Sequence, residues 1–163
     1  MTRHVKIKVN LGGKLVPQIV PKWLAKIITS REIDPAKMPT FCGAGDGWGD
    51  RTVPDFIRRI CISLACAIHD LDWAASPDSI REFIVSNLSF GMNCRYLILA
   101  SDRPWWVKEL AIVRAWGLYF TAVTTAGAIC FNPLGDTFLN PLDNPEVQNK
   151  LKRLAAAMKE PSE

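Results

Sequence analysis

The sequence predicts a mainly α-helical protein, with a glycine-rich loop before the first of three long helices and a short β-hairpin at the N-terminus. Apolar residues recur at helical spacing in three long segments, and helix-start signals open most of these segments. In addition, 48% of the 163 residues are hydrophobic. A chain of this length and composition can bury the core of one domain.

The N-terminal residues carry a strand pattern. Apolar and polar residues alternate over residues 4–10, Gly12-Gly13 follows, and apolar side chains return over residues 15–20. Two alternating runs joined by a tight glycine turn are typical of a β-hairpin. Residues 22–30 then fit a short amphipathic helix.

Helix-start signals divide the rest of the chain. After a loop rich in Pro, Gly and Asp over residues 31–51, Pro54 opens a helix that we expect to run to about Trp73. Its apolar stripe consists of Ile57, Ile60, Cys61, Leu64, Ile68 and Leu71. The further helices are expected from Ser76-Pro77-Asp78 to about Leu99, from Asp102-Arg103-Pro104 to about Cys130, and from Asn144-Pro145-Glu146 onward. The predicted organisation is an arm (1–40), a helical core (41–135) and a C-terminal loop and helix (136–163).

The charge is unevenly distributed, although the net charge is only +4. Residues 1–31 contain no acidic residue and seven basic ones, which are Arg3, Lys6, Lys8, Lys14, Lys22, Lys26 and Arg31. A basic arm of this kind suits an anionic partner, such as phospholipid headgroups, nucleic acid or an acidic protein, or is simply a solvated face. No apolar signal segment opens the chain, so we expect synthesis in the cytoplasm.

Several apolar features allow two interpretations. Residues 115–135 carry no charge and are long enough to span a bilayer, but their threonines and Pro133 favour a buried central helix. Trp105-Trp106 can anchor at a lipid interface or pack in the core, and core packing is favoured. Five cysteines leave at least one unpaired within the monomer, and Cys61, Cys94 and Cys130 fit buried positions in helices.

The glycine-rich stretch has the composition of a cation loop. Gly43, Gly45, Gly47 and Gly49 alternate with residues that include Asp46 and Asp50. Glycines allow several carbonyls to turn inward, and carbonyls with carboxylates suit a hard cation such as Ca²⁺. An ordinary surface loop has the same composition, so the stretch alone does not decide.

His69-Asp70 stands in the middle of an apolar helical segment. A carboxylate there needs a partner or a metal, because an unpaired buried charge is costly. A hydrogen-bonded structural histidine beside a surface aspartate is the alternative. Cys66 lies one turn earlier and shares a helix face with Asp70, so a crosslink to Cys42 would hold the loop near the carboxylate.

Together these motifs resemble the phospholipase A2 superfamily, above all its prokaryotic and phage-type branch. The matching residues are Phe41-Cys42-Gly43-Ala44-Gly45, Val53-Pro54-Asp55, Cys66-Ala67-Ile68-His69-Asp70 and Trp73. The likeness covers residues 41 to about 95 and continues weakly through the segment 104–131. It does not extend to residues 1–40 or 137–163.

The resemblance implies a role for each matching residue. His69 would be the general base and Asp70 a Ca²⁺ ligand. The carbonyls of Phe41, Gly43 and Gly45, and the side chain of Asp46, would complete the calcium site. The Gly43 N–H would stabilise the oxyanion, and Cys42 would pair with Cys66.

Two positions depart from the family pattern. Asn87 stands where the family has the aspartate that orients the histidine, and Trp73 replaces a tyrosine. An amide orients an imidazole but adds no negative charge. Activity is therefore expected to be reduced, unless Asp78 or Glu82 takes the place of the missing carboxylate.

The resulting prediction is a calcium-dependent hydrolase that cleaves the sn-2 acyl ester of glycerophospholipids at a membrane surface. The alternative is an inactive scaffold of the same fold that serves as a structural or virion-assembly protein and binds its partners through the basic arm. Either protein would be released or virion-associated, and no nucleic-acid partner is expected.

Overall fold

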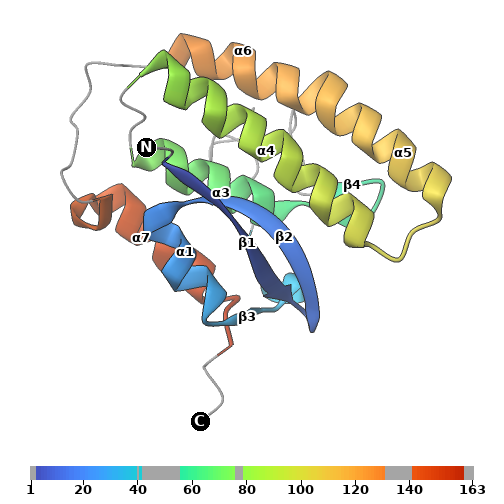
Figure 1. The fold of residues 1–163 in the computed structure, drawn as a ribbon, viewed down its shortest axis with the longest axis horizontal. Helices are drawn as coiled ribbons and strands as arrows, with labels where there is room; N and C mark the ends of the chain where they lie inside the picture. The colour runs from blue at the N-terminus through green and yellow to red at the C-terminus, as the bar shows by residue number, and fades with distance from the viewer. Residues whose placement is uncertain (1–2, 40, 42–55, 76–78, 131–140, 160–163) are drawn as a thin grey trace.

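The computed structural model describes residues 3–39, 41, 56–75, 79–130 and 141–159. These residues form a mainly helical fold with a small N-terminal sheet, as the sequence predicts (Figure 1). The main helices are α1 (Lys22–Thr29), α3 (Ser63–Ala74), α4 (Ile80–Ala100), α5 (Trp105–Arg114), α6 (Thr121–Cys130) and α7 (Pro145–Ala155). The strands are β1 (His4–Leu11), β2 (Lys14–Pro21), β3 (Glu32–Ile33), β4 (Phe56–Ile57) and β5 (Ile60–Cys61). Two short 3-10 turns cover Pro35–Lys37 and Pro141–Asp143.

The predicted β-hairpin is present. Strands β1 and β2 pair antiparallel along their whole length, and the turn residues Gly12 and Gly13 have φ angles of 57° and 84°. Glycine adopts this left-handed conformation without steric penalty, which explains why the sequence turns here. The sheet order is β2-β1-β3, with β3 parallel to β1, so β2 is an edge strand.

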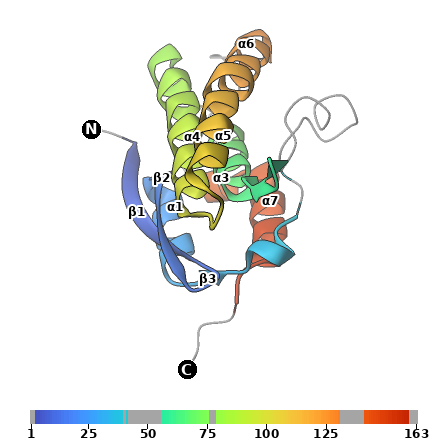
Figure 2. The ribbon, with the colours of Figure 1, turned by 90° about the vertical axis from the view of Figure 1, so that its right-hand side faces the viewer.

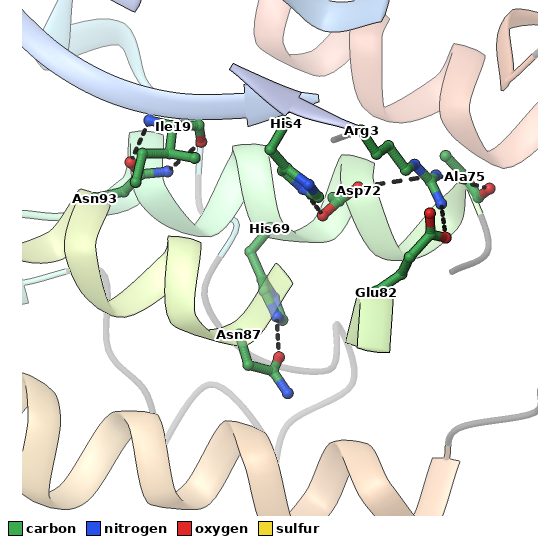
Figure 3. Close-up of polar contacts among 9 residues, drawn as sticks. All are labelled: Arg3, His4, Ile19, His69, Asp72, Ala75, Glu82, Asn87 and Asn93. Carbon is green, nitrogen blue, oxygen red and sulfur yellow. Dashed lines mark hydrogen bonds and ion pairs between the residues drawn. The ribbon is translucent and has the colours of Figure 1, made fainter. Parts of the chain in front are cut away.

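The edge of β2 is covered by α4. The Asn93 side chain accepts a hydrogen bond from the Ile19 N–H (2.7 Å) and donates one to the Ile19 carbonyl (2.8 Å) (Figure 3). Asn93 is fully buried, and this pair of bonds satisfies both polar ends of its amide. One side chain thereby ties the sheet to the longest helix of the described structure.

The helix expected from Pro54 begins later than predicted. Residues 56–61 form the β4–β5 hairpin, and α3 starts at Ser63, while residues 42–55 lie outside the described residues. The stripe of Ile57, Ile60 and Cys61 fits helical spacing, but its β-branched residues also suit paired strands. The helical expectation is therefore wrong for residues 56–62 and right for Ser63–Ala74.

Helix α4 also starts later than expected. It begins at Ile80, and the Ser79 hydroxyl caps it by accepting a hydrogen bond from the Glu82 N–H (3.3 Å). This serine–glutamate spacing is a capping box. The described residues contain one helix long and apolar enough to cross a membrane, which is α4, and 56% of its most apolar window is buried inside the fold.

Helices α5 and α6 form one continuous rod through a π-helical segment, Ala115–Phe120. The rod packs antiparallel against α4, and Figures 1 and 2 show the two side by side. Gly91 of α4 makes this close approach possible, because a Cβ there would lie 2.9 Å from the Trp116 ring.

Two expectations for this rod are wrong. Up to residue 125 it is not a buried central helix, since the buried side chains of residues 105–125 are Ala111, Ala115 and Tyr119. Trp105 and Trp106 do not pack in the core, because their side chains are 76% and 52% exposed. Both indoles lie at the exposed start of α5, directly after Pro104 and the short loop of residues 101–104.

Helix α7 begins as predicted, with the Asn144 side chain capping the Glu146 N–H (2.8 Å). The Asn144 amide also donates to the Ala74 carbonyl (2.7 Å), which fixes α7 against the end of α3. The core cluster joins the sheet, α1, α3, α4, the rod and α7, and includes the fully buried Leu24, Leu71 and Leu154. Each such side chain contributes roughly 1.5–3 kcal/mol relative to an exposed one.

Candidate active site

His69 and Asn87 come together between α3 and α4. The His69 Nε2 atom lies 2.8 Å from the Asn87 Oδ1 atom (Figure 3). An amide oxygen only accepts hydrogen bonds, so Nε2 carries the hydrogen and donates it. The other ring nitrogen, Nδ1, then holds a lone pair, as a general base requires.

Aromatic rings enclose the His69 imidazole. The centroids of the Trp73 and Phe90 rings lie 5.3 Å and 5.1 Å from that of His69. Burial lowers the pKa of His69, because a charged imidazolium loses its hydration there. The hydrogen bond to Asn87 and the charge of Asp72 act in the opposite direction but are smaller. His69 is consequently neutral at pH 7.

Asp70 faces α7 rather than solvent. Its Oδ2 atom lies 3.4 Å from the Lys150 Nζ atom, which is also 3.4 Å from a Glu146 carboxylate oxygen. Burial raises the pKa of Asp70 to about 6, although Lys150 and Arg153 oppose this rise. A carboxylate that is still desolvated with one lysine beside it retains an affinity for further positive charge.

Lys150 was not expected at the site. The basic side of the last helix fits a solvated face by sequence, yet Lys150 is partly buried and points to Asp70. No local pattern reveals a pair of residues that lie 80 positions apart.

The first of the predicted calcium-loop residues lies near the same helix. The Phe41 side chain is buried, and the Arg153 guanidinium stacks over its ring at 4.8 Å. Arg153 is one helical turn from Lys150, so the start of the loop and Asp70 share α7 as a neighbour. The other predicted loop residues, Cys42, Gly43, Gly45 and Asp46, lie outside the described residues, as does Asp78.

Among the described residues, Asn87 and Trp73 each present a buried donor without an acceptor. Within the described part of the chain, neither the Asn87 Nδ2 atom nor the Trp73 Nε1 atom has a hydrogen-bond partner. A carboxylate at 87 would present no donor, and a tyrosine hydroxyl at 73 could also accept. Two unsatisfied donors therefore belong to residues that contact the His69 ring.

A second histidine–aspartate pair lies on the sheet side of α3, and the sequence did not predict it. The His4 Nε2 atom is 2.7 Å from Asp72 Oδ2, and both side chains are almost fully buried. Arg3 lies 3.8 Å from the same carboxylate and donates a 3.0 Å hydrogen bond to Glu82 (Figure 3). Glu82 is thus held by Arg3 and does not replace the missing carboxylate at His69.

The cysteines divide into two groups. Cys61 and Cys94 are free thiols, and burial raises the pKa of Cys94. Cys61 ends β5, whereas Cys94 lies in α4 and Cys130 ends α6, so the last two have the predicted helical position. Cys66 is buried in α3, but its predicted partner Cys42 lies outside the described residues, so this disulfide stays a prediction.

The described residues contain no group of three or more His, Cys, Asp or Glu side chains suited to a metal. A calcium site at Asp70 would accordingly depend on backbone oxygens, which is the donor set predicted for the glycine-rich loop. No family model, curated protein or solved structure matches the chain.

Proposed function

We propose that this chain is a calcium-dependent, phospholipase A2-like hydrolase that cleaves the sn-2 acyl ester of glycerophospholipids. The observation that carries the proposal is the 2.8 Å hydrogen bond between His69 Nε2 and Asn87 Oδ1. It orients the ring and leaves Nδ1 as a base, while the next residue, Asp70, offers a carboxylate on another face of α3. A base at His69 beside a carboxylate at Asp70 supports the resemblance to phospholipase A2 noted in the sequence.

The proposed reaction begins with water. His69 Nδ1 takes one proton as the water oxygen attacks the ester carbonyl carbon, forming a tetrahedral oxyanion. The Gly43 N–H would donate to this oxygen. Collapse then breaks the bond between the carbonyl carbon and the ester oxygen, and His69 returns its proton to the departing alkoxide. The products are a fatty acid and a lysophospholipid.

Calcium fits the charge environment of Asp70. The Asp70 carboxylate, together with the carbonyls of Phe41, Gly43 and Gly45 and the side chain of Asp46, would hold the ion. When bound, calcium supplies Lewis-acid stabilisation of the developing oxyanion. The pKa of Asp70 is raised to about 6, which means that the nearby positive charges do not offset the cost of burying its negative charge. A divalent cation would stabilise this carboxylate.

An inactive scaffold of the same fold is the second candidate. It is favoured by Lys150, which already partly neutralises Asp70, and by Asn87, which cannot stabilise an imidazolium with a full charge. Such a protein would serve as a structural or assembly component, in which Lys8, Lys26 and Arg31 are exposed basic residues that an anionic partner would contact.

Fatty-acid release from mixed phospholipid vesicles distinguishes the two. The hydrolase is expected to release fatty acid in calcium, to stop in EDTA, and to lose activity in His69→Ala while still unfolding in one cooperative transition, at a lower temperature because a buried ring is removed. Release no greater than that of His69→Ala from several calcium-supplemented lipids would exclude the hydrolase. Calcium-dependent thermal stabilisation without turnover would select the scaffold.

A further inference from the structure

The turn between β4 and β5 has a backbone conformation that arginine disfavours, yet both of its residues are arginines. Ile57 and Ile60 are paired across the hairpin, and the two turn residues, Arg58 and Arg59, have φ angles of 50° and 65°. A two-residue turn with both φ angles positive favours Asn-Gly, because a side chain with a Cβ is strained there. The backbone alone therefore gives no reason for arginine at either position.

Both arginines face an open cavity that Arg103 also lines. This cavity, of about 410 Å³, is bounded by Arg58, Arg59, Arg103, Pro104, Trp106 and Val107. All three arginines are exposed, and among the described residues none of them has a hydrogen bond or an ion pair. The nearby Asp102 carboxylate is already paired with Lys14 at 2.6 Å. Three arginines thus line one cavity without a described counter-charge.

Exposed tryptophans adjoin these arginines. Trp105 and Trp106 open α5 and expose 76% and 52% of their side chains, and Leu110 and Val113 continue the apolar surface at 45% and 68%. The hairpin and the start of α5 occupy the same end of the molecule, which faces the viewer in Figure 2. Indole rings combine an apolar body with a polar N–H, which suits the boundary between lipid headgroups and acyl chains.

We propose that this arginine–tryptophan surface, made of Arg58, Arg59, Arg103, Trp105 and Trp106, docks onto an anionic phospholipid bilayer. Guanidinium groups pair with lipid phosphates, and the indoles enter the interfacial layer. A nucleic acid also offers phosphates, but it has no apolar layer for Leu110 and Val113. The proposal goes beyond ester hydrolysis and does not depend on it.

The test uses the full chain in EDTA with ether-linked phospholipids, which contain no carboxylic ester for the enzyme to cleave. Binding is measured by vesicle flotation and by quenching of tryptophan fluorescence with brominated alkyl chains on the same ether-linked lipids. Wild-type protein is expected to bind vesicles that contain phosphatidylglycerol, to bind pure phosphatidylcholine weakly, and to dissociate in high salt.

The principal variant combines Arg58→Asn, Arg59→Gly and Arg103→Gln. Asn-Gly is the preferred sequence for this turn, so the variant should melt no lower than wild type, and lost binding cannot be attributed to unfolding. Three basic residues at a lipid surface predict roughly 100-fold weaker binding to anionic vesicles. Trp105→Ala with Trp106→Ala should remove the quenching by brominated lipid.

The matched controls remove the same number of basic charges, or an exposed apolar side chain, from surfaces outside the arginine–tryptophan surface. Lys8→Gln, Lys26→Gln and Arg31→Gln remove three exposed charges from the N-terminal residues, and Ile80→Ala trims an exposed apolar side chain at the start of α4. These variants should bind almost as wild type does. Equal losses in the control triple, absent vesicle binding, or tighter salt-sensitive binding to single-stranded DNA than to vesicles would each overturn the proposal.

Discussion

Lys150 of α7 sets its ammonium nitrogen 3.4 Å from the Asp70 carboxylate, where the sequence predicts a calcium ion. Charge-assisted hydrogen bonds are usually about 2.7–2.9 Å long, so this one is loose. The lysine lowers the electrostatic cost of burying Asp70 without holding it tightly, which makes it a displaceable competitor of a divalent cation.

Replacing Lys150 should therefore strengthen calcium binding. Lys150→Met removes the competing charge, and we expect about tenfold tighter calcium binding by isothermal titration, or roughly 1.4 kcal/mol. The apo protein should melt at a lower temperature, because Asp70 loses its counter-charge. Lys152→Met, an exposed change two residues along α7, is the control. Unchanged or weaker calcium binding in Lys150→Met would contradict this role.

A carboxylate in place of the Asn87 amide should change the titration of His69. Burial holds the pKa of His69 below its ordinary value, so the neutral base persists above that lowered pKa and activity falls as the pH drops through it. Asn87→Asp should raise the pKa of His69 by about 1 or more and move the acidic limb of the pH–rate profile to higher pH. It should also increase turnover by about tenfold, because imidazolium is stabilised.

Histidine NMR titration provides a readout of this change that does not need activity. The resonance of His4, which bonds to Asp72 and not to Asn87, identifies the signal that does not come from His69. An unshifted His69 resonance in Asn87→Asp would show that the two side chains are not hydrogen-bonded in solution.

The buried pair of His4 and Asp72 should contribute strongly to stability. Asp72→Asn removes one partner of a desolvated charge network that includes Arg3, and we expect a loss of roughly 3 kcal/mol in urea unfolding. Asp102→Asn, which breaks an exposed pair with Lys14, should leave the urea midpoint unchanged. Similar midpoints for the two variants would refute a structural role for the network.

Gly91 should tolerate no side chain. In Gly91→Ala the new methyl group meets the Trp116 ring at 2.9 Å, and overpacking of this kind costs about 1–3 kcal/mol. Gly117→Ala is the matched control, because a methyl group added there meets no atom within 4 Å and alanine favours helical backbone. If both variants unfold at the same denaturant concentration, the rod does not approach α4 as closely as described.

Short sequence motifs correctly predicted those elements whose turns and caps depend on neighbouring residues in the chain. Alternation and Gly12-Gly13 identify the hairpin, and Asn144-Pro145 identifies the start of α7. The segment around Ile57 and Ile60 was misassigned because a short apolar run fits both a helix and a strand pair. The exposure of Trp105 depends on how the rod lies against α4, which no window of sequence contains.

The candidate site was also predictable only where the sequence itself carries a pattern. Helical spacing places His69 and Asn87 on two helices, and the resemblance to phospholipase A2 predicts the contact that the structure shows between them. Lys150 and the pair of His4 with Asp72 were missed, because each joins residues 80 or 68 positions apart through tertiary packing. Such partners carry no local pattern of their own.

The bonds between Asn93 and Ile19 also have a consequence outside the fold. An edge strand with free N–H and C=O groups is a template on which another chain can add a strand. At Ile19 both groups are already taken by a side-chain amide. A hydrophobic replacement at Asn93 would leave the Ile19 N–H and carbonyl without partners. Folded molecules could then associate by pairing their β2 strands.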